Sequence, residues 1–121
     1  MRVSPQPIVS TSIIAGARIG VVGAPSDWLI ASAPTAAAVR TTWGCELIDI
    51  PLDELYEGIS HNASNTQNPL AQQFAGCIIE PSTQDLVDAQ VVYLALAAIV
   101  KKYHLDAVTV RCFDLVLTRK M

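Results

Sequence analysis

A short apolar strand and the sharp turn after it, residues 19–32, set the plan of the whole chain. The letters IGVV precede Gly23 and Pro25, two residue types that interrupt strands. A strand this apolar is typical of a parallel sheet that is buried on both faces. Polar Ser26 and Asp27 follow its carboxyl end, which is where open α/β sheets usually bind ligands. The pattern therefore predicts an α/β fold with a binding crevice at this edge.

Strand and helix patterns alternate along the rest of the chain. Strands are predicted at 18–22, 45–50 and 107–110, with residues 111–114 at the end of the last one. Between the first two strands we predict a helix at 28–43, capped by Ser32. After the second strand come a short helix at 52–57 closed by Gly58, a loop at 60–68, and a long helix that runs from the capping box Ser82-Thr83-Gln84-Asp85 to Tyr103. Such alternation favours a parallel sheet with right-handed crossovers. We expect a three-layer sandwich of the flavodoxin or Rossmann-like kind, with strand order 2-1-3.

The domain plan follows from the same pattern. Residues 1–16 contain Pro and Ser and show no clear period, so we interpret them as an arm or linker, and residues 17–121 as one α/β domain. Only residues 115–121 follow the last predicted strand, so the next crossover helix is expected to be missing. On this reading the chain is a fragment, a pseudo-enzyme subunit or one piece of a split protein.

The composition indicates an apolar contact surface and excludes several partners. Hydrophobic residues make up 51% of the chain and charged residues 16%, so part of the apolar surface is expected to meet a second copy or a missing companion domain, with Val116, Leu117 and the apolar arc of the long helix in the contact. The net charge of −3 and the lack of a long basic run argue against nucleic acid. The longest apolar run, residues 91–100, is too short to span a bilayer. Three dispersed cysteines, Cys45, Cys77 and Cys112, predict reduced thiols and a cytoplasmic protein.

Five side chains are candidates for binding a small molecule. With strand order 2-1-3, Ser26 and Asp27 share one crevice with the residues that follow the third strand. Asp27 could instead cap a helix, and Ser26 could bond its own backbone. Trp28 could stack on a sugar ring or belong to the core. Arg111 and Asp114 could form a structural ion pair or bind a hydroxyl or anionic group.

We expect neither a catalytic residue nor a metal site in this chain. Cys112 follows a cation but has no neighbouring histidine in the sequence, which argues against a nucleophile. His61 and His104 have no metal-ligand spacing with Asp, Glu or Cys. Neither Gly-x-Gly-x-x-Gly nor Gly-x-x-x-x-Gly-Lys is present, so a flavodoxin-like binder of nucleotides or phosphate ligands is disfavoured.

Two stretches suggest a family. IGVVGAPSDWLIAS at 19–32 and LDAVTVRCFDL at 105–115, with WG at 43–44, IPLDEL at 50–55 and YLAL at 93–96 between them, resemble the central domain of L-fucose isomerase and L-arabinose isomerase-like proteins. The resemblance implies a domain of a ketol isomerase that acts on aldose and ketose sugars. It also implies a cytoplasmic, oligomeric protein that depends on a divalent metal such as manganese. The family's metal ligands lie downstream of the strand that matches residues 108–113, and no position here matches them.

Two functions remain open on this basis. The first is a carbohydrate-metabolism domain related to the sugar isomerases. It would contribute sugar contacts through the five candidate residues, as well as oligomer contacts, and would be inactive without companion segments. The second is a non-catalytic α/β module for oligomerisation or interaction, whose apolar surface is its function.

Overall fold

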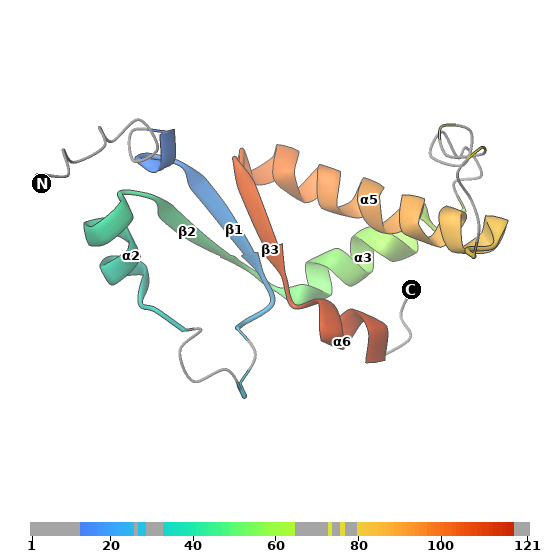
Figure 1. Cartoon of the computed structure of the whole chain (residues 1–121), viewed down its shortest axis with the longest axis horizontal. Helices are drawn as coiled ribbons and strands as arrows, with labels where there is room; N and C mark the ends of the chain where they lie inside the picture. Colours follow the sequence, from blue (N-terminus) through green and yellow to red (C-terminus); the bar gives the residue numbers. More distant parts are fainter. Residues whose placement is uncertain are drawn as a thin grey trace, which may run out of the picture.

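Three short parallel strands form the centre of the molecule (Figure 1). The computed structural model describes residues 13–25, 27–28, 33–64, 73, 76 and 80–117. The strands are β1 (Arg18–Val22), β2 (Glu46–Ile50) and β3 (Ala107–Val110), in the order β2-β1-β3. Val21 of β1 pairs with Asp49 of β2 and with Thr109 of β3. The parallel sheet and its 2-1-3 order are therefore confirmed.

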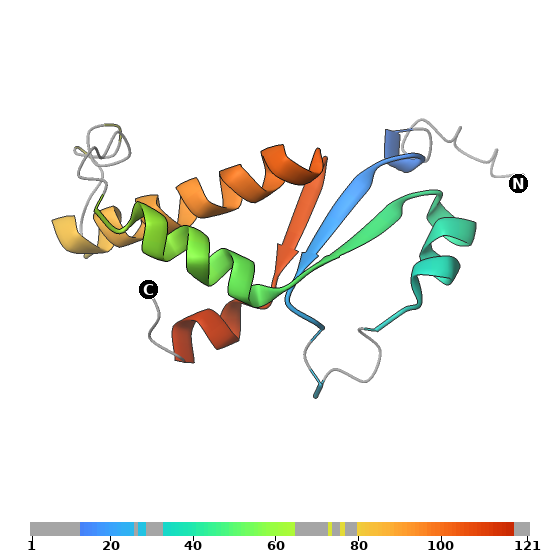
Figure 2. The same cartoon turned by 180° about the vertical axis from the view of Figure 1, so that it is seen from behind.

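The hydrophobic core lies on one face of this sheet. Figures 1 and 2 show α3 (Leu52–Asn62) and α5 (Thr83–Tyr103) side by side on that face. The buried apolar cluster consists of Val22, Ile50, Leu55, Ile59, Val91, Ala95, Ile99, Leu105 and Leu115. Gly20 of β1 lies very close to the side chain of Leu105, because a Cβ at this position would collide with that side chain. The absence of a side chain on β1 at this position leaves room for the Leu105 side chain in the core.

The two core helices also approach each other closely through small residues. A Cβ at Gly58 would lie 3.0 Å from the Cβ of Ala95 and 3.4 Å from its Cα. The prediction that Gly58 closes the helix at 52–57 is wrong, since α3 continues to Asn62. The Nδ2 atom of Asn62 donates to the Gly58 carbonyl at 2.8 Å. The predicted loop is therefore helical at 60–62, and its last residues, 65–68, lie outside the described residues.

Both ends of α5 are fixed by local hydrogen bonds. The predicted capping box is confirmed, with the Ser82 hydroxyl accepting from the Asp85 amide and the Asp85 carboxylate accepting from the Ser82 amide at 2.6 Å. At the other end His104 adopts the left-handed conformation, with φ 52°. The guanidinium of Arg18, on β1, donates to the Tyr103 carbonyl at 3.1 and 3.2 Å. The helix end is thus fastened to the start of the central strand.

On the other face of the sheet, α2 (Ala36–Trp43) packs over β2. The helix predicted at 28–43 is too long, because Ala33, Pro34 and Thr35 are not helical and the Thr35 hydroxyl caps α2 by accepting from the Ala38 amide at 3.1 Å. Pro34 accounts for part of this difference, since proline disfavours helix in the residue before it. Ser32, the predicted cap, lies outside the described residues. The helix ends at Gly44, as expected, with φ 74°.

The chain enters another helix directly after β3. Residues 112–114, predicted to occupy a strand end, instead begin α6 (Cys112–Leu117). A short helix thus follows the third strand where the sequence predicted a strand end, and among the described residues it leads to no further strand. Six residues, CFDLVL, are too few to show a helical period in the sequence. Leu115 of α6 is buried, whereas Val116 and Leu117 are 60% and 74% exposed.

The described elements thus make an α/β fold with one full helical layer and one partial layer. Because side chains alternate along a strand, the residues that do not face α3 and α5 form the outer face of the sheet. That face consists of Ile19, Val21, Leu47, Asp49, Ala107 and Thr109. In this set Asp49, Ala107 and Thr109 are exposed and the other three are half-buried.

Candidate functional site

The carboxyl ends of the three strands converge on one turn. The hydrogen-bond ladder extends past the strands, with the Gly23 amide donating to the Ile50 carbonyl at 2.9 Å and the Arg111 amide donating to the Val22 carbonyl at 3.0 Å. Gly23 has φ 77°, and a Cβ there would lie 2.9 Å from the Cβ of Arg111. Glycine is required at this position both for its backbone conformation and for the close passage of Arg111.

Arg111 is the centre of the charged groups at this edge. Its Nε lies 2.7 Å from Oδ2 of Asp114, one turn ahead in α6, and its Nη1 lies 3.8 Å from Oδ1 of Asp27. The same Nη1 donates to the carbonyls of Ala24 and Pro25 at 3.5 and 3.4 Å. The guanidinium therefore joins the turn after β1 to the start of α6. The predicted ion pair of Arg111 with Asp114 is confirmed.

Two aromatic rings lie next to this charged group. Trp28 and Phe113 meet edge to face, with ring centroids 5.5 Å apart and an interplanar angle of 78°. Trp28 is 61% exposed and Phe113 57% exposed, so each ring keeps a face available to solvent. Trp28 therefore lies at the surface and not in the core of this chain.

A hollow of about 610 Å³ opens between these groups and α2. Its walls come from all three strands, from the segment before α2 and from the start of α6; they include Val21, Leu47, Asp49, Thr109, Pro34, Arg111, Cys112 and Phe113. Asp27 and Trp28 do not line the hollow themselves. Asp27 pairs with the wall residue Arg111, and Trp28 contacts the wall residue Phe113. The walls are mostly apolar with a few charged groups, as in small-molecule sites.

Four of the five predicted site residues therefore lie together. Asp27, Trp28, Arg111 and Asp114 surround the strand ends, and Ser26 lies outside the described residues. Asp27 does not cap α2, because Thr35 is the cap of that helix and Asp27 lies in a turn. Sequence reasoning missed Phe113, which no pattern distinguished from a core residue.

Asp49 and Thr109 were also missed as members of the site. Both occupy outward positions of strands that were themselves correctly predicted. Alternation along those strands, combined with the predicted order 2-1-3, could have placed them beside Val21.

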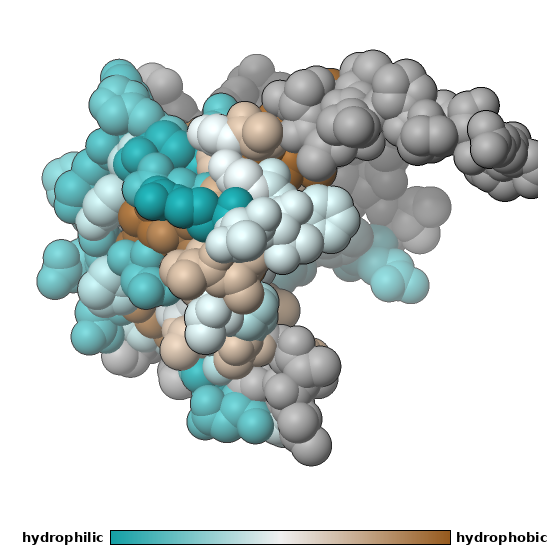
Figure 3. Space-filling model, turned by 90° about the vertical axis from the view of Figure 1, so that its left-hand side faces the viewer, coloured by the Kyte–Doolittle hydropathy of each residue, from teal (hydrophilic) through white to brown (hydrophobic). Residues whose placement is uncertain are grey.

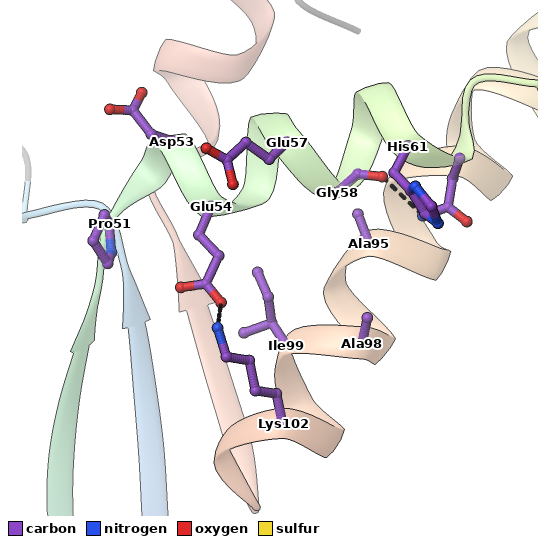
Figure 4. Close-up of a pocket in the computed structure, with 11 residues that line it drawn as sticks. Pro51, Asp53, Glu54, Glu57, Gly58, His61, Ala95, Ala98, Ile99 and Lys102 are labelled. Carbon is purple, nitrogen blue, oxygen red and sulfur yellow. Dashed lines mark hydrogen bonds and ion pairs between the residues drawn. The ribbon is translucent and has the colours of Figure 1, made fainter.

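A second groove runs between α3 and α5, with a volume of about 560 Å³ (Figure 4). Asp53, Glu57 and His61 of α3 lie along it, and Glu54 reaches across to Lys102. Glu54 Oε1 lies 2.5 Å from Lys102 Nζ. The Glu54–Lys102 pair ties the two helices together.

The donor set for a metal is not present in the described part of the chain. There, no three His, Cys, Asp or Glu side chains come together as a metal ion requires. The residues present do not fit the manganese implied by the isomerase resemblance, so we derive no catalytic step through a metal. Cys45 is buried, Cys112 is exposed and both are free thiols; Cys77 lies outside the described residues.

Among the described helices, α5 alone is long and apolar enough, by length and composition, to cross a membrane. The core helices of soluble proteins meet the same criterion. Val91, Ala95 and Ile99 of α5 are buried and belong to the hydrophobic core. A soluble domain is consistent with this arrangement.

Comparison with known proteins yields no match to a protein-family model, to a curated protein or to a solved structure.

Proposed function

We propose that this chain is a sugar-binding α/β domain related to the sugar isomerases, which holds a pentose or hexose at the carboxyl edge of its sheet. The observation that carries the proposal is the hollow at the strand ends, where Arg111 and its carboxylate partners adjoin the exposed Trp28–Phe113 pair. Sugars present hydroxyl groups at their edges and apolar C–H faces. A site with both charged hydrogen-bonding groups and aromatic faces suits that combination.

The charges favour a neutral ligand over an anionic one. Asp27, Asp49 and Asp114 surround the single guanidinium of Arg111, and two of them pair with it. A phosphate or carboxylate would meet this excess of negative charge at close range. Hydroxyl groups can instead accept from the guanidinium and donate to the carboxylates.

The role of the domain in this proposal is contact with the sugar, without chemistry of its own. Any isomerase reaction would take its metal and its acid–base groups from a companion segment or partner chain. The free thiols of Cys45 and Cys112 support the proposed cytoplasmic location.

Tryptophan fluorescence tests the sugar site, because the chain has two tryptophans. Trp43→Phe leaves Trp28 as the reporter, and its emission is expected to shift on titration with L-fucose or L-arabinose at roughly 1–100 mM. Trp28→Phe is the matched control, since it leaves Trp43 at the far end of α2 and is expected to give no shift. Arg111→Lys is expected to weaken the response about tenfold, because lysine lacks the planar fork of donors. If the emission of Trp28 does not change with either sugar over this range, the proposed site is ruled out.

A second candidate function, an interaction module, is favoured by a separate observation. Every residue of α2 is at least partly exposed, and the outer face beside it is largely uncovered. We propose that the three-layer sandwich expected for this strand order is completed by association.

A further inference from the structure

We propose that two copies of this chain associate through their outer faces, each inserting its α2 over β1 and β3 of the other. The inference specifies the partner for the second candidate function. The partner's α2 would enter the hollow that the first candidate function assigns to a sugar, so the two functions compete for that space. The first step is that α2 is too short and too exposed to be stable in a single copy of the chain. A helix of eight residues is not stable in water without tertiary packing. None of the eight residues of α2 is buried, and Trp43 at its end is 53% exposed.

The second step is the space beside α2. In the described residues α2 packs over β2, while Ala107 and Thr109 of β3 are exposed on the same face. Strands lie about 4.8 Å apart and a helix is about 10 Å wide, so a three-stranded sheet has room for α2 and one more helix. The hollow of about 610 Å³, which has Val21 and Thr109 in its walls, occupies part of this space.

A second copy supplies a helix of the required length and character. A two-fold axis parallel to the strands would bring the partner's α2 alongside the first, over β1 and β3. Ala36, Ala37 and Ala38 at the start of α2 permit close approach between the two helices. One shared layer of two helices would then cover both sheets.

The chemistry of the face suits self-association. Figure 3 views the molecule from the side that bears α2; apolar and weakly polar side chains gather in the middle of this view, with hydrophilic ones above them, below them and along the left margin. On the outer face of the described strands, Asp49 is the one charged side chain. Pairing therefore brings few like charges together. One short helix and part of a three-stranded sheet from each copy make a small contact beside the ~800 Å² per partner of a standard interface, so a weak dimer with a micromolar Kd is expected.

Sedimentation equilibrium of the full chain, from about 1 to about 500 μM, tests the inference. The mass is expected to rise from monomer to dimer over this range. Thr109→Arg places a charge where the partner's α2 would lie and is expected to weaken the dimer at least 100-fold. Thr83→Arg is the matched control, because Thr83 is exposed at the start of α5 on the opposite side and its substitution is expected to leave the dimer intact.

The outcomes separate this inference from its competitors. Far-UV circular dichroism of Thr109→Arg checks that the variant is folded. If it is not, Ala107→Arg at the next outward position of β3 replaces it. A monomer at every concentration overturns the inference and indicates that another segment or a different protein covers the face. A dimer that folded Thr109→Arg or Ala107→Arg leaves unchanged also overturns it, and points to Val116 and Leu117 as the contact. Sugar titration of Trp28 in dilute protein, where the monomer prevails, tests the first candidate function apart from the dimer.

Discussion

At the scale of single residues, the backbone of His104 stores a small strain. Its φ of 52° and ψ of 54° are left-handed, and its amide donates to the Lys101 and Val100 carbonyls to close α5. This conformation costs a non-glycine residue roughly 1–2 kcal/mol. Glycine avoids that cost, but its greater conformational freedom in the unfolded chain offsets part of the gain. His104→Gly is therefore expected to raise the free energy of unfolding by about 0.5–1 kcal/mol in urea denaturation. His104→Ala keeps the Cβ and should show no such gain; an equal gain would assign the effect to the imidazole.

Glycines show why residue-level prediction from the sequence is incomplete. Gly44 was predicted to end a helix and does so, with φ 74°. Gly58 was predicted to end a helix in the same way but lies inside α3, facing Ala95. Glycine serves both as a helix terminus and as a point of close approach. The local sequence does not distinguish the two uses, because the second depends on a helix that follows much later in the chain.

At the scale of elements, α3 and α5 are joined by a clamp that responds to acid. Glu54 accepts from Lys102 and, at 2.7 Å, from the Tyr103 hydroxyl, and these two bonds hold the pKa of Glu54 below its ordinary value of 4.5. A carboxyl whose pKa falls on folding adds stability above its unfolded pKa and loses that stability as the pH drops through its folded pKa. The free energy of unfolding should therefore decline below about pH 5 more steeply in the wild type than in Glu54→Gln.

Urea denaturation at a series of pH values from about 7 to about 2.5 measures this difference. The gap between the wild type and Glu54→Gln is expected to shrink as the pH falls. Glu57→Gln, at an exposed position of the same helix, is the control and should follow the wild type. A gap that stays constant across the series would show that Glu54 acts through packing and not through its charge.

Among the elements, strong local signals were predicted well and short apolar segments were not. The strands and α5 carry apolar runs and a capping box, and their positions are confirmed. The segment before α2 and the six residues of α6 lack such signals. Their structure depends on Pro34, on Thr35 and on the ion pair of Arg111 with Asp114. The position of the candidate site could be predicted from the sequence, because the strand order determines which loops meet. The contact of Phe113 with Trp28 could not be predicted, because it depends on α6.

At the scale of the whole molecule, stability is expected to be uneven across the two faces of the sheet. β1 pairs with strands on both sides and contributes Val22 to the core, whereas α2 buries no residue. Amides of β1 should exchange with solvent only through global unfolding, and those of α2 through local opening. In dilute protein, below the expected dimer range, hydrogen exchange of α2 should be at least about 100-fold faster than that of β1.

Protein concentration distinguishes the origin of any protection in α2. Association would slow α2 exchange as the concentration rises, because only the dimer buries that helix. The amides of α3, which lie in the core layer of a single copy, serve as the internal control and should not change. If α2 were as protected as β1 in dilute protein, the helix would be covered within one chain, and the half-filled outer layer would not be a surface for a second copy.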